Sequence, residues 1–179
     1  IFNLLFPIES LGLDVAASKH GDKTILAAGG EYGVRGIHEC SFSDTQQTMQ
    51  WVYDVVSTHY GIDLTDGTVP IGIDWGGGYG NAVGDPMERD GVSVVQIHGS
   101  ATSDVDPQRY ANKRAELYGE VGRWLDPSGD ISMMNILLPN NTMLIQELTA
   151  PQKIYAGRDG MKFYITPKDR RGADENFEG

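Results

Sequence analysis

The sequence predicts an α/β fold in which helices flank a mixed β-sheet. Short apolar stretches separated by glycine-rich turns open the chain and predict strands, whereas later stretches have the apolar spacing of helices. Two further apolar stretches, 69–74 and 92–99, predict more strands in the middle of the chain. Strands interleaved with helices are typical of a layered α/β domain. The 179 residues are enough to bury the core of one such domain.

The first third of the sequence predicts three strands followed by a helix. The strands are expected at 11–16, 24–30 and 34–40, and the short turns between them favour antiparallel pairing. Ser43 and Gln46 form a capping-box pattern, with Ser43 as the N-cap of the helix. Apolar residues then repeat on one helical face until Gly61, which should end the helix: Met49, Val52, Val56 and Tyr60.

The remainder of the sequence predicts two strands, two helices and a terminal strand. Asp106 followed by Pro107 predicts the start of a helix that continues to about Leu125. A shorter helix is expected near 140–148, and 162–166 should form an edge strand or a hairpin. We expect residues 1–10 to be a linker or edge segment and 11–179 to be the functional domain. Because the chain begins without Met, we also expect it to be part of a longer protein.

Composition excludes several classes of protein. No apolar run approaches the roughly 20 residues of a membrane span, and the apolar first residues lack the basic flank of a signal peptide. Cys40 is the single cysteine and cannot form an internal disulfide; it is expected to be a small buried apolar residue. The four histidines lie far apart in the sequence without metal-ligand spacing, which argues against a zinc site.

The net charge of −11 is unevenly distributed along the chain. Residues 37–106 hold eleven acids and one base, whereas 107–125 hold four bases and two acids. Arg109, Lys113 and Arg114 have the i, i+4, i+5 spacing of a phosphate-facing stripe on the second helix, although a solvated helix face would have the same spacing. We therefore expect any binding to a polyanion to be weak and confined to one side.

Two aspartates share a sequence context that predicts a metal site. Asp14 ends the apolar stretch LGLD, and Asp74 ends the apolar stretch VPIGID. Carboxylates at the ends of neighbouring strands would repel each other, and a bound Mg²⁺ or Mn²⁺ removes that repulsion. The alternative is that each aspartate is only a strand-end or turn residue. The glycine run Gly76–Gly80 would let a backbone approach a phosphate, but it matches neither a dinucleotide fingerprint nor a P-loop.

Four segments together resemble a known family, in the order LGLDVA–HGDKT, GIDWGGGYGNAVGD, YANKRAELYGEVGRWL and ELTAPQKIY–KFYITPKD. They are similar to the nuclease domain of the large terminase subunit of tailed bacteriophages, over residues 11 to about 171. The resemblance implies a ribonuclease-H-like fold and cleavage of concatemeric viral DNA by a two-metal mechanism. It also implies an ATPase domain upstream in the full protein.

The resemblance assigns the first two acidic metal ligands to Asp14 and Asp74. The third is usually found in a Ser-Pro-Asp-x-Ala-Asp-Ala stretch, which this chain lacks, so Asp174 is the closest match and Asp169 and Glu175 stay open. All three positions would be both catalytic and metal-binding, with Mg²⁺ or Mn²⁺ as cofactor. The expected DNA contacts are lysines, arginines and glycines near the site and along the basic segments: Lys19, Lys23, Gly77, Gly78, Arg109, Lys113, Arg114, Lys168, Arg170 and Arg171.

The expected partners are double-stranded DNA and, by resemblance, the portal protein and the small terminase subunit, with no membrane. Such a viral protein would act in the host cell cytoplasm and would not be secreted. Three alternatives stay open: another ribonuclease-H-like nuclease of the resolvase type, a phosphotransferase, and a non-catalytic acidic binding module. A sugar-kinase-type site normally needs two large lobes, for which 179 residues are too few.

Overall fold

The computed structural model describes residues 6–16, 23–76, 79–126, 128, 136–156 and 162–166. The chain divides into two compact units. Unit 1 comprises Ile1–Gly99 and Pro127–Pro139, and unit 2 comprises Ser100–Asp126 and Asn140–Gly179. None of the described helices is long and apolar enough to cross a membrane.

Unit 1 is built on the predicted mixed sheet, with five strands in the order β3-β2-β1-β4-β5. The strands are β1 Ser10–Asp14, β2 Thr24–Gly30, β3 Gly33–Cys40, β4 Ile71–Asp74 and β5 Val94–Ile97. The first three strands pair antiparallel, as predicted, whereas β4 runs parallel to both β1 and β5. Ahead of β1, Phe6 and Ile8 are buried and Glu9 N–H donates to the carbonyl of Gly29.

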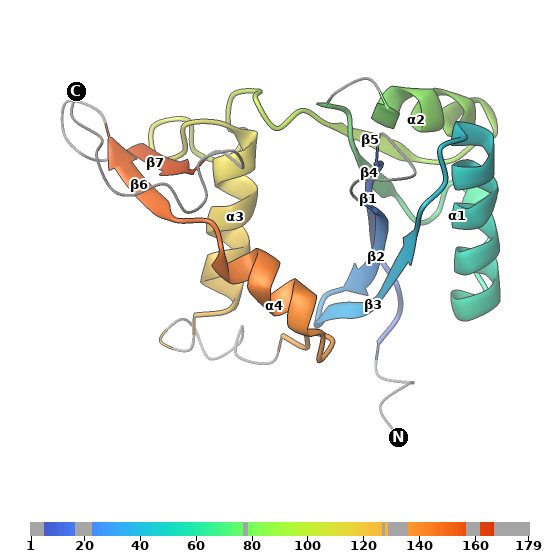
Figure 1. Cartoon of the computed structure of the whole chain (residues 1–179), viewed down its shortest axis with the longest axis horizontal. Coiled ribbons are helices and arrows are strands. Elements are labelled where there is room, and N and C mark those ends of the chain that lie inside the picture. The colour runs from blue at the N-terminus through green and yellow to red at the C-terminus, as the bar shows by residue number, and fades with distance from the viewer. Residues whose placement is uncertain are drawn as a thin grey trace. The chain divides into compact units, whose positions relative to one another are not determined.

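Two helices cover one face of this sheet (Figure 1). Helix α1, Thr45–Tyr60, buries Val52 and Val56 against Leu13 and Ile73 of the central strands. Its C-cap is Gly61, as predicted, with φ of 69°. The N-cap is Asp44 and not Ser43, because the Asp44 carboxylate accepts from Gln46 N–H at 2.8 Å. A short 3₁₀ turn, Leu64–Asp66, leads towards β4.

Helix α2, Tyr79–Arg89, lies between the strands predicted at 69–74 and 92–99, where no helix was predicted. It contains Pro86, and Gly80 and Gly84 are both buried. A Cβ on Gly84 would lie 2.3 Å from the Trp75 ring, so glycine is required for this helix to pack against the strand end. Propensity alone disfavours such a helix, and its packing on the sheet overrides that preference.

Unit 2 combines two helices with a hairpin. The elements are α3 Lys113–Trp124, α4 Thr142–Thr149, β6 Lys153–Ala156 and β7 Lys162–Ile165, and the last two pair antiparallel. The predicted helix start at Asp106 is wrong. Asp106 instead caps a turn by accepting from Arg109 N–H, and Tyr110 bridges to Phe163 of the hairpin. Asn112 is the N-cap, accepting from Ala115 N–H at 2.9 Å.

Candidate active site at the carboxyl edge of the sheet

The structure places Asp14 and Asp74 side by side at one edge of the sheet. Each aspartate directly follows a residue of the parallel pair Leu13–Ile73, so the two occupy equivalent positions on neighbouring strands. Adjacent strands lie about 4.8 Å apart. Because side chains alternate along a strand, the buried Leu13 and Ile73 face the helices and both aspartates face the opposite side, where they are exposed.

The chain beyond Asp74 turns sharply and fixes the orientation of that carboxylate. Asp74 Oδ1 accepts from Gly76 N–H at 3.0 Å, which is a side-chain turn typical of aspartate. A Cβ on Gly80 would lie 2.0 Å from the Asp74 carbonyl oxygen, so the first turn of α2 can approach the strand end only because residue 80 is glycine. The glycine run therefore serves close packing at the site, while Gly77 and Gly78 themselves lie outside the described residues.

These two carboxylates suit part of a site for a hard divalent cation. Their oxygens are the ligands that Mg²⁺ and Mn²⁺ prefer, and both side chains are open to water. Among the described residues no group of three or more His, Cys, Asp or Glu side chains could hold a metal. The predicted third ligand, Asp174, and its alternatives Asp169 and Glu175 lie outside the described residues.

The described members of the predicted DNA contacts have different surroundings. Arg109 is exposed but lies in the turn before α3, so the predicted helical stripe with Lys113 and Arg114 does not form. Lys113 donates to Asp104 at 2.8 Å and to Glu116 at 2.5 Å, and these hydrogen bonds raise the pKa of its ammonium group. Arg114 lies over the Tyr118 ring, and its Nη2 is buried without a hydrogen-bond partner.

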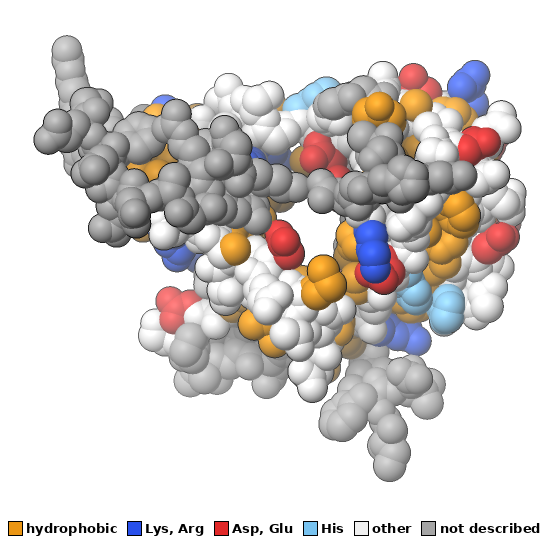
Figure 2. Space-filling view, viewed as in Figure 1, with side chains coloured by type: hydrophobic (Ala, Val, Ile, Leu, Met, Phe, Trp, Pro, Cys, Tyr) orange, Lys and Arg blue, Asp and Glu red, His pale blue; other side chains and the backbone are white. Residues whose placement is uncertain are grey.

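No continuous basic stripe is visible among the described residues on the face drawn in Figure 2, where lysine and arginine side chains are scattered among acids. Lys23, which immediately precedes β2, forms an ion pair with Glu39 of β3. The remaining predicted contacts, Lys19, Lys168, Arg170 and Arg171, lie outside the described residues.

Two of the four histidines meet in the fold, although they are far apart in the sequence. The rings of His38 on β3 and His59 on α1 have centroids 4.7 Å apart, and His38 Nε2 is 2.7 Å from the Tyr60 hydroxyl. Burial, together with the neighbouring His59, lowers the pKa of His38. A hydrogen bond and two packed rings explain this cluster without a metal ion.

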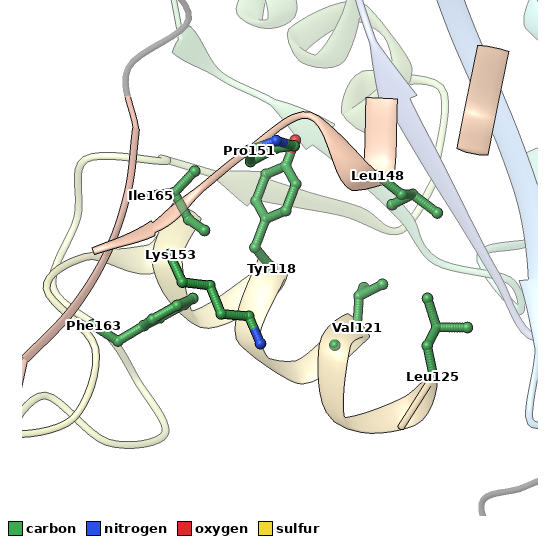
Figure 3. A pocket seen from close by; sticks show the side chains of 9 residues that line it. Tyr118, Val121, Leu125, Leu148, Pro151, Lys153, Phe163 and Ile165 are labelled. Carbon is green, nitrogen blue, oxygen red and sulfur yellow. The ribbon is translucent and has the colours of Figure 1, made fainter. Parts of the chain in front are cut away.

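Unit 2 contains a small cavity between α3, the end of α4 and the hairpin (Figure 3). Its walls are mainly apolar, and Lys153 is the charged residue of its lining. The volume of about 90 Å³ is far below the roughly 300 Å³ at which small-molecule sites begin. The cavity could hold one apolar side chain but not a nucleotide.

The fold is shared with solved nuclease domains. The nuclease domain of the large terminase subunit of the bacterial virus Sf6 aligns with a TM-score of 0.63 at 17% identity, covering 90% of this chain and 78% of that chain. A lysine-to-alanine mutant of that domain with manganese and β-thujaplicinol aligns with a TM-score of 0.65 at 17% identity and with the same coverage. A lysine-to-alanine mutant of the Sf6 large terminase subunit with calcium aligns with a TM-score of 0.63 at 18% identity, covering 96% of this chain and 85% of that chain.

These likenesses show that the chain has the ribonuclease-H-like α/β fold, as the sequence predicted. The sequence matches no protein-family model and no curated protein. Glu39 was not among the predicted site residues, because only the strand register reveals that it lies on the same face as the two aspartates. Its position as the penultimate residue of a predicted strand was the available signal.

Proposed function

We propose that this chain is a metal-dependent endonuclease that cleaves double-stranded DNA. The observation that carries the proposal is the pair of exposed carboxylates, Asp14 and Asp74, at matched ends of two parallel strands. The ribonuclease-H-like fold supports it, as do the manganese and calcium present in solved structures of the similar Sf6 nuclease domain.

In the proposed mechanism Asp14 and Asp74 hold divalent cations, with Asp174 as the proposed third ligand. Mg²⁺ or Mn²⁺ held by these carboxylates would supply Lewis-acid chemistry for hydrolysis of the phosphodiester. The protein's own contribution is to fix the carboxylates on rigid strand ends. Asp74 Oδ1 accepts from Gly76 N–H, and the Asp74 side chain is exposed. Two-metal hydrolysis of the phosphodiester is the form of this chemistry that we propose.

The biological setting that we propose is genome packaging by a tailed bacteriophage. The chain would cut concatemeric viral DNA in the cytoplasm of the host, as the nuclease part of a large terminase subunit with an upstream ATPase domain. The portal protein and the small terminase subunit are the proposed protein partners. The support for this setting is the similarity to the Sf6 terminase nuclease domain over 90% of the chain.

The test is conversion of supercoiled plasmid to nicked and linear forms by the purified chain. We expect cleavage with Mg²⁺ or Mn²⁺ and none in excess EDTA, with activity returning when the metal is restored. Undiminished cleavage in EDTA would refute the metal mechanism. No cleavage with either metal, by a chain whose melting temperature still rises on adding Mn²⁺, would instead support a non-catalytic acidic binding module.

A further inference from the structure

We propose that Glu39 is a positioning residue that holds the ammonium group of Lys23 at the carboxyl edge of the sheet, where Lys23 contacts the phosphate of bound DNA. This inference rests on the proposed nuclease function and assigns a role to a residue that the metal mechanism does not use. The first observation behind it is the register of β1, β2, β3 and β4.

The strand register places Glu39 in the same row as the two aspartates. Asp14 pairs with Ile25 of β2, and Ile25 pairs with Glu39 of β3. Directly paired residues point to the same face of a sheet, so Glu39, Ile25, Asp14 and Asp74 share the face opposite α1 and α2. Two strand spacings of about 4.8 Å separate the backbones of Glu39 and Asp14.

Lys23 lies where the chain enters this row. It precedes Thr24, whose hydroxyl accepts from Ala16 N–H at 3.0 Å, so Lys23 is next to the segment that leaves Asp14. Its ion pair with Glu39 brings its ammonium group to the face that carries the aspartates. Lys23 is two residues before Ile25 of the row, and no other lysine or arginine among the described residues lies within two residues of a member of the row.

The exposure of the pair favours a role in the site over a role in stability. The side chains of Lys23 and Glu39 are 47% and 52% exposed, and exposed ion pairs typically contribute 1 kcal/mol or less. A free lysine side chain samples many rotamers, so a carboxylate that restricts it lowers the entropy lost when the ammonium group meets a phosphate. Glu39 also offsets the positive charge of Lys23, which reduces the attraction of other anions to the carboxyl edge of the sheet when no DNA is bound.

The experiment compares plasmid cleavage by Lys23→Met, Glu39→Gln and the double variant, with kcat and KM measured separately. Matched controls are Glu31→Gln, an exposed carboxylate at the β2–β3 turn, and Lys153→Met in unit 2. We expect Lys23→Met to lower kcat about 100-fold, as for loss of one group that stabilises transition-state charge. Glu39→Gln should lower kcat about tenfold, as for loss of an orienting partner, with both controls unchanged.

The double variant separates positioning from an independent effect. If Glu39 acts only through Lys23, adding Glu39→Gln to Lys23→Met changes kcat no further. With Glu39 present, Lys23→Arg should be more active than Lys23→Met, because arginine keeps the positive charge. Fully additive losses, or a Glu39→Gln variant as active as its control, would overturn the proposal while leaving the nuclease function intact. A parent chain without metal-dependent cleavage would overturn both. Melting temperatures matching the parent exclude loss of folding as the cause.

Discussion

Two carboxylates in this molecule, Glu116 in unit 2 and Asp74 in unit 1, have opposite surroundings. In unit 2, Glu116 is 3% exposed, and its carboxylate accepts from Ser103 Oγ, Lys113 Nζ and two backbone N–H groups. In unit 1, Asp74 is exposed and accepts from Gly76 N–H within its own turn. The buried carboxylate is saturated with donors, whereas the exposed one can still coordinate a ligand.

The difference separates structural acids from candidate catalytic ones. Burial raises the pKa of Glu116, but the hydrogen bonds from Lys113, Ser103 and the backbone of Val105 and Asp104 outweigh it and lower the pKa to about 2. Glu116 thereby fastens the loop 103–106 to the start of α3. Asp14 and Asp74 are instead both exposed at strand ends, and neutralising one of them should leave the fold intact.

The largest expected effect is on cleavage. Asp14→Asn and Asp74→Asn should each reduce metal-dependent nicking at least 100-fold, because a carboxylate ligand is replaced by a neutral amide. Their melting temperatures without metal should equal or slightly exceed that of the parent, since removing one of two neighbouring negative charges relieves repulsion. Plasmid nicking and thermal unfolding measure the two quantities. Normal nicking by either variant would move the active site elsewhere.

DNA binding should be weak, independent of sequence and steeply dependent on salt. The net charge of −11 opposes a polyanion, and Lys113 is already paired with two carboxylates. Arg109, which is exposed, should contribute more: Arg109→Gln should reduce the slope of log affinity against log salt by about 1. Titrations of unrelated duplexes at several salt concentrations test this. Tight binding to one sequence that is insensitive to salt would contradict it.

The parts of the fold that sequence could predict are those where local pattern and packing agree. Apolar stretches between glycine-rich turns located the five strands of unit 1, and the two aspartates at strand ends located the candidate site. Helix α2 was missed because Gly80, Gly84 and Pro86 resemble a loop, and the Trp75 ring that makes Gly84 necessary is a tertiary contact. Such a contact forms only in the folded chain and cannot be predicted from the local sequence.

The start of α3 and the role of Glu39 were missed for a related reason. Asp106 and Pro107 are a good helix start, yet Phe163 N–H donates to the Arg109 carbonyl and Ala111 N–H to the Phe163 carbonyl. These bonds hold the end of the turn beside the hairpin, so the helix begins only at Lys113. Glu39 joins the aspartate row only through the pairing of β1, β2 and β3. Pairings over such sequence distances are set by the folded structure and cannot be read from residue spacing.

The contrast between the two acidic sites predicts opposite effects on stability. Glu116→Ala should lower the free energy of unfolding by about 3 kcal/mol, because buried donors from Ser103 and Lys113 lose their acceptor. Cleavage per folded molecule should stay within a factor of about 2, which is the reverse of the Asp74→Asn result. Glu116→Gln, which keeps one acceptor oxygen, should be milder. Urea unfolding combined with nicking assays would reveal a catalytic role for Glu116 if activity fell with folding preserved.

The smallest expected effect is a pH dependence of stability centred on His38 of β3. Its pKa is lowered by burial and by His59, while Tyr60 and the Arg35 guanidinium above the Tyr60 ring are the other titratable or charged groups at this cluster. A lowered pKa means that the unfolded chain binds the proton more readily than the folded one. The contribution of His38 to stability is therefore complete above about pH 6.5 and is lost as the pH falls below it.

The folded chain should therefore lose stability as the pH falls from 7.5 to 5, because His38 is half-buried and its protonated form is disfavoured in the fold. His38→Gln should flatten this part of the pH profile, whereas His98→Gln, at an exposed position outside the cluster, should leave it unchanged. Urea unfolding at pH 5, 6, 7 and 7.5 measures the difference. An identical slope for parent and His38→Gln would show that acid destabilisation originates elsewhere, with the carboxylates as the remaining titrating groups.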